Sequence, residues 1–207
     1  MHTPAPAPVP SSPVKKYLFA DESGNFDFRD HRRYPGASRY FAVGTLLLTD
    51  ERRRHELQSA LLNLRFELAR QGKVYNEAFH AATDDQWVRD AVFDVLKDIP
   101  LTVDVTILEK AKAQPHIRRS EECFHQHAWY AWYYHLRFHG PRYFGPDDDL
   151  LLVSAALGAK KTRAAFRGAV TSVANQVLDR RIRTKNMAFW PQPATPASRP
   201  WATCRGR

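Results

Sequence analysis

Two acidic residues stand together where a short apolar run ends, in the segment Asp21-Glu22-Ser23-Gly24. The preceding run, Tyr17-Leu18-Phe19-Ala20, is typical of a buried strand, and the serine and glycine favour a turn. A carboxylate at the end of a core strand suits a hard cation such as Mg²⁺ or Mn²⁺, which prefers oxygen ligands. We therefore predict Asp21 as the first metal ligand and a catalytic residue. The same segment is also compatible with a plain turn whose polar side chains bond locally.

Further acidic and proton-transferring residues are candidates for the same site. Neighbouring residues of a regular strand point to opposite sides, so Glu22 joins Asp21 as a catalytic metal ligand only if the strand bends or ends there. Glu77 and His80 lie close together and suit a second acidic ligand and a proton-transfer group. Glu109, at the exit of a later strand, is a further candidate ligand. The alternatives are a structural bridge for His80 and a surface ion pair for Glu109.

Basic residues outnumber acidic ones, and the formal net charge is +9. Such a charge attracts anions and favours contact with nucleic acid, which we expect as the partner. The candidate phosphate-binding residues are Lys110, Lys112, Lys160, Lys161 and Arg163. Lysines and arginines in such groups are equally typical of a solvated helix face.

Several function classes and locations are excluded by missing patterns. The sequence has no Gly-x-x-x-x-Gly-Lys loop and no Gly-x-Ser-x-Gly turn, which excludes P-loop nucleotide hydrolysis and the serine hydrolase elbow. The two cysteines, Cys123 and Cys204, are too few for a disulfide framework. Residues 1–16 lack the basic start and apolar run of a signal peptide, so none is expected there, and no window reaches the roughly 18 apolar residues of a membrane span. We expect a cytoplasmic protein with no membrane contact.

The elements that must position these residues form an α/β pattern. Strands are predicted at 17–20, 40–48, 101–109 and 149–157, with a further short strand or edge segment at 74–80. Helices are predicted from a cap at Thr49 to about Arg70, from a cap at Thr83-Asp84-Asp85 to Pro100, from Ser120 to about Gly140, and over 161–178. Trp87, Ala91, Val92, Val95 and Leu96 form the expected inner face of the second helix. This order predicts a mixed sheet flanked by helices.

The domain organisation follows from where the periodic pattern begins and ends. Residues 1–16 are rich in proline and alanine and are predicted to be a disordered lead-in. A single domain is expected over 17–185. Residues 186–207 contain repeated prolines and no period, so we expect an irregular tail.

Taken in order, several short motifs resemble those of the domain-of-unknown-function family numbered 3800. They are Tyr17 to Gly24, Phe79-His80-Ala81 with Asp84, Arg89 to Phe93, Glu109-Lys110 before Gln114-Pro115, Leu151 to Ala156, Lys160-Lys161 with Phe166, Gln176, and Phe189-Trp190-Pro191. The resemblance covers about residues 17–191 and lies in the order of the motifs more than in any single motif.

This resemblance implies an RNase H-like α/β fold and a metal-dependent nuclease or related phosphodiester hydrolase, in a family with some members linked to mobile elements and defence. It implies Asp21 as the matching ligand position for Mg²⁺ or Mn²⁺. Family members continue past Phe-Trp-Pro into a Leu-Gln-x-Ala-Asp segment, where this chain has Pro200 to Arg207. We therefore expect a truncated or frame-shifted end. A chain that lacks this segment lacks one ligand, and its activity can be lost while the fold survives. The alternative is a non-catalytic nucleic-acid-binding or toxin–antitoxin-like interaction protein.

Overall fold

The computed structural model describes residues 14–73, 79, 84–139, 143–155, 163–178, 182 and 184–190. The strands are β1 (Lys15–Ser23), β2 (Tyr40–Leu48), β3 (Thr102–Glu109), β4 (Asp149–Ala155) and β5 (Thr184–Trp190). The helices are α1 (Glu51–Arg70), α2 (Gln86–Lys97), α3 (Glu121–His139) and α4 (Arg163–Leu178), with the short 3₁₀ helix η1 (Lys110–Lys112) after β3. No helix in these ranges is long and apolar enough to cross a membrane.

The strands form one five-stranded mixed sheet in the order β3-β2-β1-β4-β5. β2 is antiparallel to both of its neighbours, whereas β1, β4 and β5 are mutually parallel. β2 alone therefore runs against the other described strands, and β1 lies at the centre. The predicted α/β class, with a mixed sheet and flanking helices, is confirmed.

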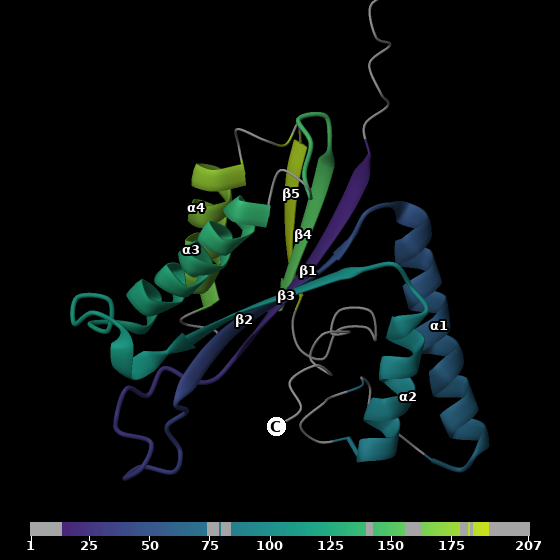
Figure 1. Cartoon of the computed structure of the whole chain (residues 1–207), viewed down its shortest axis with the longest axis horizontal. Helices are drawn as coiled ribbons and strands as arrows, with labels where there is room; N and C mark the ends of the chain where they lie inside the picture. Colours follow the sequence, from purple (N-terminus) through teal and green to yellow (C-terminus); the bar gives the residue numbers. More distant parts are fainter. Residues whose placement is uncertain are drawn as a thin grey trace, which may run out of the picture.

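Helices cover both faces of the sheet (Figure 1), with α1 and α2 on one side and α3 and α4 on the other. The alternation along β1 decides which side chain enters which layer. Tyr17 and Phe19 pack in the core with residues of α1 and α2, and Leu18 and Ala20 pack with residues of α3 and α4. β1 is consequently buried on both faces, as expected for a central strand.

The first helix follows its predicted pattern except at its cap. Leu57, Leu61 and Leu68 recur at helical spacing and are buried. Gly72 has the positive φ of 72° that commonly follows a helix end, so the predicted stop is confirmed. The predicted cap at Thr49 is wrong, because Asp50 instead accepts a hydrogen bond from the backbone nitrogen of Arg53 at 2.8 Å.

The aromatic helix α3 begins as predicted, with the Ser120 hydroxyl accepting from the backbone nitrogen of Cys123 at 3.1 Å. Its inner face carries Trp129 and Trp132, both almost fully buried. The indole nitrogen of Trp132 donates to Oγ1 of Thr45 at 3.2 Å, which joins α3 to β2. Buried indole groups need such partners, and this one aligns the helix on the sheet.

The second helix differs from its prediction in one residue. Val88, Val92 and Leu96 form its buried face. Trp87, predicted to point inward, is 36% exposed and has the Lys73 ammonium 3.8 Å from its ring centre. At the start of the helix Val88 therefore takes the buried position predicted for Trp87, while Val92 and Leu96 are buried as predicted.

Both ends of the predicted domain need correction. β1 begins at Lys15, because Lys15 and Lys16 pair with the start of β4. The irregular tail expected from residue 186 is wrong over 186–190, which lie in β5 and pair with β4. The possible strand at 74–80 lies outside the described residues, apart from Phe79, which is buried.

Candidate functional site at the carboxyl end of the central strand

Asp21 lies near the carboxyl end of β1, where β4 and β5 also end. It is 2% exposed, and its Oδ1 accepts from the backbone nitrogen of Glu22 at 3.0 Å. By alternation, its side chain shares the face of Phe19, which is the face covered by α1 and α2. Asp21 therefore lies at the end of a core strand, and its carboxylate is buried.

The sheet surface beside Asp21 is open toward β3. Gly44 is its partner on β2 and carries no side chain. Val105, the next partner across the sheet, is 44% exposed, and Ile107 on the same face is 63% exposed. The β3 side of this face therefore carries exposed side chains, whereas the Asp21 carboxylate itself is buried.

Glu22 has a different role from Asp21 and lies on the opposite face. It is buried, and its Oε1 accepts from Nε1 of Trp129 at 2.8 Å and contacts Nε2 of His125 at 3.0 Å. These bonds join β1 to α3 inside the core. The predicted pairing of Glu22 with Asp21 at one metal is not what the structure shows, because β1 stays regular through both residues.

His125 belongs to a buried polar cluster with Glu22 and Trp129. Its Nε2 lies 3.0 Å from Oε1 of Glu22 and 3.2 Å from the donor Nε1 of Trp129, and its role as donor or acceptor follows from the ring tautomer. Its Nδ1 is buried and has no hydrogen-bond partner among the described residues. The rings of Phe26 and Phe166 pack against this histidine and keep water away from it.

Gly24 ends the motif, and its position requires glycine. Its φ is +102°, a conformation that side chains disfavour. A Cβ there would lie 2.5 Å from the carbonyl oxygen of Tyr40. The chain thus leaves β1 through a turn that packs directly on the start of β2.

The loop between β1 and β2 is closed by Asn25 and Ser38. The backbone nitrogen of Asn25 donates to Oγ of Ser38 at 3.0 Å, and the backbone nitrogen of Ser38 donates to Oδ1 of Asn25 at 3.2 Å. The side-chain amide of Asn25 also donates to the carbonyl of Gly36 at 2.6 Å. Both ends of the loop are therefore fixed beside the sheet.

Lys110, predicted to bind phosphate, is 4% exposed and holds this loop instead. Its Nζ donates to the carbonyl oxygen and to Oδ1 of Asn25, both at 3.0 Å, and to the carbonyl oxygen of Asp27 at 2.6 Å. Burial lowers the pKa of Lys110. The prediction of a direct phosphate contact is not supported, because all three donors of the ammonium already have acceptors.

Glu109 is a surface ion pair, which was the alternative left open by the sequence. Its two oxygens lie 2.9 Å from Nη2 of Arg39 and 2.9 Å from Nζ of Lys112. Hydrogen bonds from Lys112 and Arg39 lower the pKa of Glu109. The strand register and the usual strand spacings put its Cα about 16 Å from that of Asp21, so the two carboxylates do not share one ion.

Other predicted site residues are only partly covered by the structure. Glu77, His80, Lys160 and Lys161 lie outside the described residues, and for Arg163 only its place at the start of α4 is described. Among the residues that are described, no three histidine, cysteine or acidic side chains gather into a group that could hold a metal ion.

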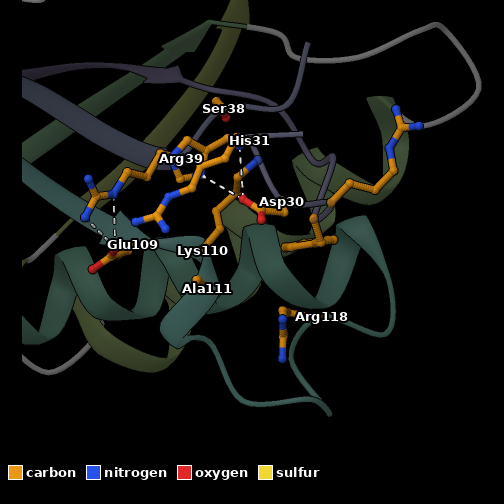
Figure 2. Close-up of a pocket in the computed structure, with 11 residues that line it drawn as sticks. Asp30, His31, Ser38, Arg39, Glu109, Lys110, Ala111 and Arg118 are labelled. Atoms are coloured by element: carbon orange, nitrogen blue, oxygen red, sulfur yellow. Dashed lines mark hydrogen bonds and ion pairs between the residues drawn. The ribbon is translucent and has the colours of Figure 1, made fainter. Parts of the chain in front are cut away.

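A basic pocket was missed by the sequence reasoning. It has a volume of about 390 Å³ and lies between the β1–β2 loop and the segment from Glu109 through η1 to Arg118 (Figure 2). Its charged lining residues are Arg29, Asp30, Arg32, Arg39, Glu109, Lys110 and Arg118. The sequence feature that could have indicated this pocket is the basic segment 29–33, which contains three arginines and a histidine.

No protein-family model matches this chain, and no curated protein matches it.

Proposed function

We propose that the chain is an RNase H-like, divalent-metal-dependent nuclease with Asp21 as the central ligand of Mg²⁺ or Mn²⁺. The observation that carries the proposal is a buried carboxylate at the carboxyl end of the central strand, next to a glycine and an exposed stretch of β3. The mixed sheet with a single reversed strand supports the fold assignment.

The donor chemistry at Asp21 fits one oxygen ligand for a hard cation. Glu22 and Glu109 do not fit as its companions, because one lies on the opposite face and the other lies about 16 Å away by the strand spacings. Such an ion would polarise a phosphodiester oxygen and activate a bound water. The chain's own contribution is to hold the Asp21 carboxylate rigidly between β2 and β4.

The test uses the purified full chain with Mn²⁺ or Mg²⁺ and end-labelled single- and double-stranded RNA and DNA. We expect metal-dependent cleavage that falls at least about 100-fold in Asp21→Asn, because the variant loses the charge that holds the cation. Asp94→Asn is the matched control, since Asp94 is an exposed carboxylate paired with Lys97 on α2. Cleavage that survives Asp21→Asn, or that needs no metal, would reject the proposal.

A second candidate is a non-catalytic nucleic-acid-binding protein. The basic pocket favours it, together with the separation of Glu22 and Glu109 from Asp21. Nucleic-acid binding in EDTA with unchanged affinity in Asp21→Asn, combined with no cleavage under any metal, would favour binding over catalysis.

A further inference from the structure

We infer that the basic pocket between the β1–β2 loop and η1 binds a phosphate group, either free or within a nucleotide chain. This site is separate from Asp21 and does not depend on hydrolysis. Its residues come from segments that the sequence analysis did not connect, and Figure 2 shows Arg39, Lys110, Glu109 and Asp30 gathered along one part of its wall with Arg118 beyond Lys110.

The charge of the lining favours an anion. The lining contains five basic side chains, four of them arginines, and two carboxylates. His31, which also lines it, lies 3.8 Å from Asp30 and would add charge only when protonated. A concave surface with this excess of one sign concentrates oppositely charged ligands.

Three of the five cations are already held by partners. Arg29 forms a two-pronged pair with Asp27, with nitrogen–oxygen distances of 3.0 and 2.7 Å. Arg39 pairs with Glu109 at 2.9 Å. Lys110 is fixed by the loop carbonyls. These residues shape the wall and supply a positive field, but most of their donors are occupied.

Arg32 and Arg118 are the two lining cations whose guanidinium groups are not held by a carboxylate of the described residues. Within the described part of the chain, neither forms an ion pair with a carboxylate, and Nε of Arg118 is buried without a hydrogen-bond acceptor. Because this Nε is buried, a phosphate in the pocket would be bound by the terminal nitrogens of the guanidinium. The planar guanidinium can also bind phosphate through two parallel hydrogen bonds.

The pocket wall is formed before any ligand arrives. The Asn25–Ser38 bonds close the loop, and Lys110 attaches it to η1. Binding therefore requires little ordering of the backbone, which removes one of the usual entropic costs. The volume of about 390 Å³ lies within the range of small-molecule sites and has room for a phosphate with its sugar.

The experiment measures binding in EDTA, so that cleavage plays no part. One arm follows a fluorescent single-stranded oligonucleotide by anisotropy over a range of salt concentrations. The other follows the arginine Nε–H resonances by NMR as inorganic phosphate is added. The test variant is the double change Arg32→Gln with Arg118→Gln. The matched control is Arg52→Gln with Arg70→Gln, which removes the same charge from exposed positions on α1, on the other side of the sheet.

We expect the pocket variant to bind the oligonucleotide at least about tenfold more weakly and with a shallower salt dependence, while the control is nearly unchanged. Arg118→Lys should give an intermediate loss, because it keeps the charge but not the two-pronged geometry. A shift of the Arg118 resonance with phosphate, but no oligonucleotide binding, would support a small phosphate ligand and count against the nuclease.

Equal weakening in the pocket and control variants would overturn the inference, since the effect would then be net charge alone. So would the absence of both oligonucleotide binding and a phosphate shift. These outcomes are separable from the proposed function, because Asp21→Asn leaves the pocket intact and is scored by cleavage. Far-UV circular dichroism and urea unfolding check that each variant is folded.

Discussion

Glu22 and His125 are 103 residues apart in the sequence and meet in the core, with Oε1 of the carboxylate 3.0 Å from Nε2 of the ring. Trp129, one helical turn further along α3, donates to the same oxygen at 2.8 Å. One carboxylate oxygen thus contacts two side chains of α3. This convergence fixes the rotation of α3 over the end of β1, where Asp21 lies on the other face.

Replacing Glu22 with alanine should lower the free energy of unfolding by about 3 kcal/mol, because the buried groups of His125 and Trp129 lose their shared polar partner. Glu22→Gln should cost less, since the amide oxygen can still accept from Nε1 of Trp129. Urea unfolding measures both. Glu67→Ala, at an exposed ion pair on α1, should change stability by less than about 1 kcal/mol. A Glu22→Ala variant as stable as this control would show that the core bonds contribute nothing.

Gly24→Ala should destabilise the protein by about 2 kcal/mol or more, because alanine is strained at positive φ and its Cβ would meet the Tyr40 carbonyl. Gly36→Ala in the same loop is the control. A Cβ at Gly36 would meet nothing within 4 Å. Its stability, measured by thermal or urea unfolding, should stay within about 0.5 kcal/mol of the parent. Equal effects at the two glycines would contradict the close approach at Gly24.

Lys110→Met and Lys112→Met form a matched pair in η1. The first removes a buried ammonium that holds the Asn25 and Asp27 carbonyls, so we expect a loss of about 2 kcal/mol and faster amide exchange in the β1–β2 loop. The second removes an ammonium that is 81% exposed, and we expect less than about 1 kcal/mol. Hydrogen exchange by NMR and urea unfolding report both quantities. Similar exchange rates in the two variants would mean that Lys110 does not hold the loop.

Asp27 should titrate at unusually low pH. The Arg29 side chain, followed by its backbone nitrogen, holds the pKa of this carboxyl at about 2, compared with an ordinary value of 3.8. The pair therefore favours the folded state above pH 3.8, and this contribution is lost as the pH falls through about 2. A carboxyl-carbon NMR titration should show the low midpoint in the parent and a higher one in Arg29→Gln. The same midpoint in both would exclude Arg29 as the cause.

The elements that were predicted correctly are those whose residue types repeat with the period of a helix or of a strand. Leu57, Leu61 and Leu68 repeat along α1, and residues 102–109 alternate along β3, so local spacing is enough. β5 was missed because its formation depends on pairing with β4 and not on any pattern of its own. Met187 and Phe189, which pack against the core, give too short a signal among the prolines that follow.

The candidate site was predictable only for Asp21, whose place follows from the strand before it. Glu22 was predicted as a companion ligand of Asp21 if the strand bent, but β1 stays regular, and the partners that Glu22 has in the core lie far along the chain and leave no local signal. Lysine is a residue type that commonly binds phosphate, and only the fold shows that Lys110 is buried. Arg32 and Arg118 were missed because the pocket joins two loops that are distant in the sequence.

The central position of β1 has a consequence for the order of folding. Its antiparallel partner β2 is the next strand along the chain, whereas its parallel partner β4 follows more than a hundred residues later, with Lys15 opposite Asp149. Contacts so distant in sequence form slowly, because a long loop must close first. During synthesis, β1, β2 and β3 can pair while one edge of β1 still lacks β4. The segment that carries Asp21 is therefore exposed to wrong pairing until residues 149–155 leave the ribosome.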